Sequence, residues 1–394
     1  MIKKIYKYLN LENSILVFLI LFGFHLAFIG GYGSDEDTLP MIGAFESMLG
    51  GGKVMASRFT PYPVAELGIG FLSYHFGSWA ANSVTFIFMI ISAILFYISF
   101  EDLKNKNNLF LFLLLCLSNA VLFFDNLEPM DYSWAFLFLS LGLVSLKKSH
   151  FELAVIFFGI CIGTRIYFLL FIFFSIFYFQ YKPDLKFVRK SFIFLGSFFI
   201  GGLFYLTIWY QHGFGIEWLT AVTPNHQGFF GLLARFGYKF LMTLGFAFSC
   251  FFIYLCLKNK INFKKIYRIK KHQVGIFIIF SNLLLFFFIP AELSYLQPLL
   301  ICFYYLITKI FSKKIVYALI IINLSAWIVD VQLLKIIYKS NDTCNNVEAI
   351  DANFDINFKK GRLFDFYESR DKIKCWIRDD SERSKKILRG QALK

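Results

Sequence analysis

Long apolar stretches separated by short polar segments follow one another along most of the chain. A helix of about 17 to 25 apolar residues matches the thickness of the hydrocarbon core of a bilayer. The pattern predicts about eleven spans, at residues 12–30, 79–100, 109–124, 132–146, 151–164, 166–181, 191–211, 238–257, 273–289, 296–311 and 315–338. We therefore expect an all-α fold, a polytopic transmembrane helical bundle.

The apolar segment at residues 151–181 leaves two alternatives open, because Arg165 lies in its middle. A single helix of this length would be about 45 Å long, which is more than the hydrocarbon requires. Two short spans that meet at Arg165 are therefore preferred. A single helix would move each later loop to the other side of the membrane.

The composition supports the membrane class. Of 394 residues, 58% are hydrophobic and 21% are aromatic, with 54 Phe. A soluble protein of this length could not bury so much apolar surface, because its own surface grows too slowly with size.

The positive charges indicate how the chain is oriented. The net charge is +14 at pH 7, and Lys and Arg gather in alternate loops, most densely in residues 258–272. By the positive-inside rule, these loops and the N-terminus lie in the cytoplasm. Loops 31–78, 125–131, 212–237 and 290–295 and the C-terminus are then outside. The distribution indicates a multi-pass protein of the cytoplasmic membrane and argues against a nucleic-acid partner.

Two domains are expected, a transmembrane domain at residues 1–339 and a small extracytoplasmic tail at residues 340–394. The tail has a mixed polar and charged composition and is too short for a large core of its own. Its two cysteines, Cys344 and Cys375, form a disulfide in an oxidising compartment or remain two free thiols.

The first outer loop, residues 31–78, has the densest polar sequence between the spans. Asp35, Glu36 and Asp37 follow the first apolar stretch directly. These acids suit the N-terminus of a surface helix over residues 38–49. One of the carboxylates could also be a general base whose pKa is tuned by its like-charged neighbours. The two interpretations are compatible, because a helix N-terminus positions a carboxylate firmly.

Two arginines are candidates for binding a phosphate. Arg58 lies in the same loop, in SRFTPYPVAE, which ends at Glu66. A guanidinium suits phosphate because its fork makes paired, charge-assisted hydrogen bonds. Arg165 lies between apolar stretches, where a charge is costly unless it faces water, a partner or a headgroup. Each arginine could instead anchor the chain at the level of the lipid headgroups.

Two further outer loops carry polar candidates. Glu292 and Tyr295 lie in PAELSYLQP and could orient Arg165, or else cap a helix and join an aromatic belt. The loop DNLEPMD has three acids that could hold a divalent cation or simply face water. These acids are Asp125, Glu128 and Asp131.

Other catalytic motifs are missing from the sequence. It has no nucleophile elbow, no Walker loop, no dinucleotide fingerprint and no metal-type spacing of His or Cys. The cytoplasmic loops are too short to form a nucleotide-sugar domain. This absence favours a lipid-linked donor if the protein is a transferase.

The order of these features resembles the GT-C superfamily of integral membrane glycosyltransferases. A first span, an immediate Asp-Glu pair, a surface helix and a turn rich in Arg and Pro are similar to the branch with protein O-mannosyltransferases and lipid A aminoarabinose transferases. The resemblance implies a catalytic Asp in the first outer loop and a sugar donor on polyprenyl phosphate. Asp35 then has the catalytic position, and Asp37 competes because the triple acid leaves the register open.

The late loop also resembles a GT-C pattern, Glu-x-x-Tyr/Phe-x-x-Pro. Glu292, Tyr295 and Pro298 match it, whereas Ser294 stands where Arg is common. The resemblance implies that Glu292 and Tyr295 bind sugar hydroxyls or orient Arg165, and the departure at Ser294 argues against a phosphate contact from this loop.

The predicted function is an inverting glycosyl transfer at the outer membrane surface. Asp35 would take the proton of an acceptor hydroxyl, and Arg58 and Arg165 would stabilise the leaving polyprenyl phosphate. The acceptor is a glycan, a lipid or a protein, and a divalent cation is left open because the family has members with and without one. The alternatives are a transporter or lipid-linked sugar flippase and a non-catalytic subunit of the cell envelope.

Overall fold

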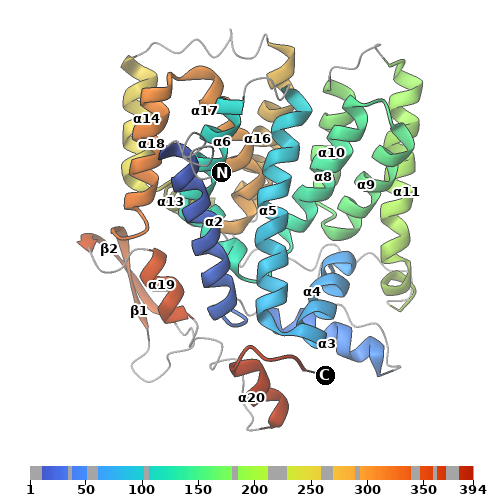
Figure 1. Ribbon diagram of the computed structural model, residues 1–394, viewed down its shortest axis with the longest axis horizontal. Helices are drawn as coiled ribbons and strands as arrows, with labels where there is room; N and C mark the ends of the chain where they lie inside the picture. The colour runs from blue at the N-terminus through green and yellow to red at the C-terminus, as the bar shows by residue number, and fades with distance from the viewer. Residues whose placement is uncertain are drawn as a thin grey trace, which may run out of the picture.

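The computed structural model describes residues 11–33, 38–50, 61–101, 106–179, 185–211, 229–258, 269–288, 293–338, 347–357, 362–369 and 381–393. Within these residues, helices run side by side as a bundle, and shorter helices and a two-stranded sheet lie at one end of it (Figure 1). The structure thus confirms a helical bundle, and it adds a small sheet that the sequence did not predict.

The first half of the bundle follows the chain order. Its elements are α2 (Leu11–Ile29), α5 (Ser78–Phe100), α6 (Lys106–Ser118), α7 (Ala120–Phe124), η1 (Asp125–Leu127), α8 (Tyr132–Lys147), α9 (Phe151–Thr164), α10 (Phe168–Tyr178) and α11 (Phe187–Gln211). Glycines let two of these helices approach closely: a Cβ at Gly159 would lie 3.3 Å from the backbone nitrogen of Gly201. Small residues at a contact allow such packing where both helices are apolar.

The second half contains α13 (Phe229–Leu244), α14 (Phe246–Lys258), α16 (Lys270–Phe288), η2 (Leu293–Leu296), α17 (Gln297–Ile310), α18 (Lys313–Ser325), β1 (Asp330–Tyr338), β2 (Val347–Asn357), α19 (Arg362–Ser369) and α20 (Glu382–Leu388). Strands β1 and β2 pair antiparallel. The expected span at 238–257 is bent by 87° between α13 and α14. The bend is at Gly245, whose φ of +82° is a conformation that favours glycine.

The final predicted span, residues 315–338, differs most from the structure. Helix α18 ends at Ser325, and residues 330–338 form β1. The β-branched and aliphatic sequence DVQLLKIIY suits a strand as well as a membrane helix. Pairing with β2 supplies the backbone hydrogen bonds that decide between the two. By contrast, the segment 151–181 forms two helices, α9 and α10, and not a single long helix, in agreement with the alternative that the sequence favoured.

Within the described residues, three helical segments are long and apolar enough to cross a membrane, namely 78–100, 187–211 and 293–310. The number rises to five if the bent pairs α6–α7 and α13–α14 each count as one span. Other apolar helices in the described part of the chain are shorter. These helices are consistent with a membrane protein, whereas the count of about eleven spans and the orientation stay predictions.

The segment predicted to be the first outer loop, residues 31–78, contains two helices, α3 (Thr38–Leu49) and α4 (Pro63–Phe76). The bounds of α3 confirm the helix expected over residues 38–49. The C-terminal segment, residues 381–393, packs against both. The backbone N–H of Leu393 donates to the carbonyl of Tyr74 (2.9 Å), and the Arg383 guanidinium pairs with Glu46 (2.6 Å).

Tyr32 ties the end of α2 to this C-terminal segment. Its hydroxyl donates to the carbonyl oxygens of Ser73 (3.1 Å) and Gln391 (3.0 Å). Burial raises the pKa of Tyr32 well above its usual range, so the hydroxyl keeps the proton that it donates. The C-terminal segment is therefore joined to the C-terminal end of α2, at the end of the bundle where α3 and α4 lie (Figure 1).

Candidate functional site

Three of the predicted site residues lie within the described part of the chain, Glu66, Arg165 and Tyr295. The structure brings all three to one end of the bundle, around the break between α9 and α10. The other predicted site residues lie outside the described residues. They are Asp35, Glu36, Asp37, Arg58 and Glu292.

Arg165 forms a buried, bidentate ion pair. It stands in extended backbone after α9, and it is 2% exposed. Its Nε lies 2.7 Å from Oδ2 of Asp131, and its Nη2 lies 2.7 Å from Oδ1 of the same carboxylate. Asp131 is itself fully buried. The charge that the sequence left without a partner is therefore compensated from the loop before α8.

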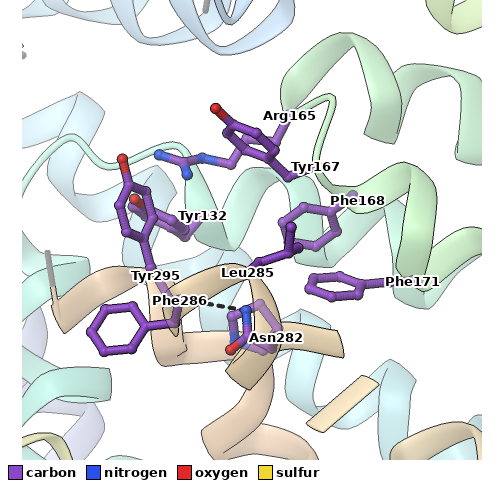
Figure 2. A pocket seen from close by; sticks show the side chains of 10 residues that line it. Tyr132, Arg165, Tyr167, Phe168, Phe171, Asn282, Leu285, Phe286 and Tyr295 are labelled. Atoms are coloured by element: carbon purple, nitrogen blue, oxygen red, sulfur yellow. Dashed lines mark hydrogen bonds between the residues drawn. The ribbon is translucent and has the colours of Figure 1, made fainter. Parts of the chain in front are cut away.

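Three tyrosines surround the guanidinium of Arg165. Its Cζ lies 3.3 Å from the ring centroid of Tyr132, 4.6 Å from that of Tyr62 and 5.2 Å from that of Tyr295. Aromatic faces attract a cation, and more strongly where water is excluded. The guanidinium points away from the α9–α10 connection toward Tyr132 and Tyr295 (Figure 2). Four separate segments of the chain thus meet at one cation.

Glu66 is buried at the start of α4, with 3% of its surface exposed. Its Oε1 accepts a hydrogen bond from the backbone N–H of Tyr62 (3.1 Å), the residue at the helix N-cap. A carboxylate at this end of a helix is stabilised by the dipole and by N–H groups that have no partner within the helix. Glu66 therefore holds the turn that brings Tyr62 to Arg165, and its role as a substrate ligand stays a prediction.

Tyr205, on α11, also belongs to this buried cluster. Its hydroxyl donates to the carbonyl of Ile162 (2.8 Å), one turn before Arg165, and the side chain is 5% exposed. The sequence interpretation did not include Tyr62, Tyr132 or Tyr205. One feature of the sequence could have indicated the cluster. Arg165 lies between apolar stretches and therefore needs a partner, and Asp131 is predicted to lie on the same side of the membrane.

The three acids of DNLEPMD have separate partners. Asp131 pairs with Arg165, and Asp125 Oδ2 accepts a hydrogen bond from the Ser294 hydroxyl (2.7 Å). The carboxylate of Glu128 packs against Gly33, where an added Cβ would overlap it. Among the described residues, no group of three or more His, Cys, Asp or Glu is placed to hold a metal ion.

Gly33 is the last described residue before the segment that contains Asp35, Glu36 and Asp37. Its φ is +78°, and Asn82 fixes the preceding turn by donating to the carbonyl of Gly31 (2.7 Å). The described chain resumes at Thr38, which is fully buried. Gly33 therefore contacts the loop that ends at Asp131, and the three predicted catalytic acids themselves lie outside the described residues.

A small cleft of about 40 Å³ opens beside the Arg165 cluster. Its polar end is formed by Tyr132, Arg165 and Tyr295, and Asn282 donates to the carbonyl of Tyr295 (2.9 Å) (Figure 2). The remaining walls are largely apolar and come from α10, α16 and α17, with Phe168, Phe171, Leu285, Phe286 and Pro298 among them. The cleft is thus polar at one end and apolar along its sides.

Comparison of the chain with models of known protein families, with curated proteins and with solved structures finds no match. The resemblance to GT-C glycosyltransferases therefore stays a prediction that rests on the short motifs of the sequence.

Proposed function

We propose that the protein is a membrane glycosyltransferase that takes a sugar from a polyprenyl-phosphate donor at the outer face of the cytoplasmic membrane. The observation that carries the proposal is the cleft beside Arg165. Its apolar sides match the character of a hydrocarbon chain, and its polar end matches that of a phosphate and sugar. At about 40 Å³ the cleft has room for only a small part of such a donor. Long lipids could enter between α10 and α16, whose side chains line the cleft.

Arg165 is paired with Asp131, so it does not bind a phosphate as an unpaired cation would. Two of its five N–H donors are used by Asp131, and the pair carries no net charge. A neutral pair can still orient a headgroup through its other donors, but it attracts a dianion less than a single cation does. Arg58 is therefore the better candidate for neutralising the leaving phosphate.

The chemistry that we propose is a single inverting displacement. Asp35 accepts the proton of the acceptor hydroxyl, the oxygen forms a bond to the anomeric carbon, and the bond from that carbon to the donor phosphate breaks. Asp37 is the competing base. A divalent cation is left open.

The test of this function is a transfer assay with a matched pair of cleft variants. Membranes with the wild-type protein are expected to transfer labelled sugar from a polyprenyl-phosphate donor to endogenous acceptors. Leu285→Trp fills the cleft, so we expect the rate at low donor concentration to fall about tenfold, equal to about 1.4 kcal/mol. Leu284→Trp on the same helix is the control, because Leu284 is 45% exposed and does not line the cleft. Equal rates in both variants would contradict donor binding in the cleft.

The orientation gives a second test. A reporter of membrane sidedness inserted at Lys265 is expected in the cytoplasm, because the surrounding segment 258–272 is rich in Lys and Arg. A reporter at Gly213, in loop 212–237, is expected outside. If the Lys265 reporter is found outside, the active site cannot face the outer surface in the arrangement that we propose.

A transporter or lipid-linked sugar flippase is the second candidate. Two bent pairs favour it, because α6–α7 and α13–α14 are bent by 83° and 87°. Discontinuous helices often form the substrate sites of transporters. Under this alternative, labelled donor would cross the membrane of proteoliposomes in the absence of any acceptor, and no labelled glycan product would form.

A further inference from the structure

The segment that contains α3 and α4 is flanked by glycines with positive φ. Gly31 and Gly33 follow α2, with φ values of +67° and +78°, and Gly77 separates α4 from α5, with a φ of +88°. Other residues rarely adopt this backbone conformation. Residues at the ends of helices absorb the changes of φ and ψ when one part of a chain turns against another. The flanking glycines are therefore suited to be hinges.

Helices α3 and α4 pack together as one unit that reaches the Arg165 cluster. The ring of Phe45 on α3 lies 6.1 Å from that of Phe71 and 5.9 Å from that of Tyr74, both on α4. At the other end of α4, the ring of Tyr62 lies 4.6 Å from Cζ of Arg165. A turn of this unit about the flanking glycines would therefore move one wall of the cluster.

The C-terminal residues 381–393, which we call the strap, lie on the backbone at both hinges. The strap is at the same end of the bundle as α3 and α4 (Figure 1). A Cβ added to Gly390 would lie 3.3 Å from Cα of Gly31, and one added to Gly77 would lie 2.7 Å from the carbonyl oxygen of Gly390. That oxygen accepts hydrogen bonds from the backbone N–H (3.0 Å) and the hydroxyl (3.1 Å) of Ser78. The strap thus joins the two hinges to each other.

The strap also holds the two helices themselves. Ile387 is 2% exposed and forms a small apolar cluster with Tyr32, at the end of α2, and Ile42 of α3. The backbone N–H of Leu393 bonds to the carbonyl of Tyr74 on α4 (2.9 Å). The strap is therefore attached to both moving helices and to the ends of α2 and α5, which belong to the bundle.

We propose that the strap holds α3 and α4 against the bundle, and that its release lets both helices turn about the flanking glycines and carry Tyr62 away from Arg165. Ile387 is the one buried apolar side chain in the strap, and the ion pair between the strap and α3 is partly exposed. So small an attachment opens at a lower cost than the core of the bundle does. The proposal does not depend on glycosyl transfer, because it concerns only how the segment is held.

The experiment measures how fast a buried thiol on α4 reacts when the strap is weakened. Ser73→Cys is the reporter, because Ser73 is fully buried on α4 and cysteine has nearly the same shape. The full-length protein in nanodiscs is treated with a water-soluble maleimide, and modified peptides are quantified by mass spectrometry. Ile387→Asp is expected to speed the labelling of position 73 about tenfold, because the rate follows the open population. The native Cys161, fully buried in α9, should keep its wild-type rate.

The matched control is Leu388→Asp, which adds the same charge to the same helix at a position that is 39% exposed. Labelling in this variant should equal that of the reporter protein alone. Gly390→Ala tests the strap without the change at Ile387, because the added Cβ would overlap the hydroxyl of Ser78. Its control is Gly43→Ala on α3, where the added Cβ meets open space. Unchanged labelling in the Ile387 and Gly390 variants, or an equal rise at Cys161, would overturn the proposal.

Discussion

Replacing Asp131 with asparagine is expected to lower the free energy of unfolding by about 3 to 5 kcal/mol. The change removes the negative charge that compensates Arg165, while both side chains stay almost completely buried. A guanidinium cannot lose its proton to escape an apolar site, so the uncompensated charge would persist. The tyrosines around it supply cation–π attraction, which is too weak to replace a carboxylate.

Unfolding of the purified full-length protein in detergent measures this effect. The matched control is Glu46→Gln, which breaks the pair with Arg383 at the surface, where the two side chains are 22% and 49% exposed. That loss should be about 0 to 1 kcal/mol. The double variant Arg165→Met, Asp131→Leu should recover much of the stability, because apolar residues of similar volume carry no desolvation cost. If Asp131→Asn cost no more than the surface control, the ion pair would not organise this site.

Asp35→Asn is expected to lower the rate of sugar transfer by about a hundredfold to ten-thousandfold, the range in which a general base contributes. The amide keeps the shape of the side chain but cannot accept the acceptor's proton. The amount of protein in the membrane should not change, because the substitution adds no volume. Labelled product formed per unit of protein is the quantity to measure.

Asp37→Asn is the matched control, since it removes the same charge two residues away. A rate close to that of the wild type would assign the base to Asp35, whereas a loss confined to Asp37→Asn would move the base to that position. Equal activity of the two variants would exclude the proposed mechanism. Profiling the lipids and glycans of a deletion strain would then identify the sugar and its acceptor.

The helices could be predicted from local patterns. Helix α3 begins at Thr38 and ends at Leu49, and the three acids that precede it indicate its N-terminus. The break at Arg165 was expected because a charge interrupts two apolar stretches, and α9 and α10 meet there. These features depend on residues near one another in the chain.

The errors have a common physical cause. The apolar segment after α18 suits both a helix and a strand, and its pairing with β2 decides the outcome. The bend at Gly245 likewise follows from a backbone conformation that glycine permits but does not require. Apolar periodicity cannot distinguish these cases, because it contains no information about distant partners.

The sequence by itself determined the helical class, the apolar surface and the position of Arg165 between two helices. Only the tertiary structure decided which groups meet at this arginine, because Asp131, Tyr62, Tyr205 and Tyr295 come from four other segments. Helix formation follows from local backbone bonding and side-chain pattern, whereas a buried charge takes its partner from whichever segments the packing brings within reach.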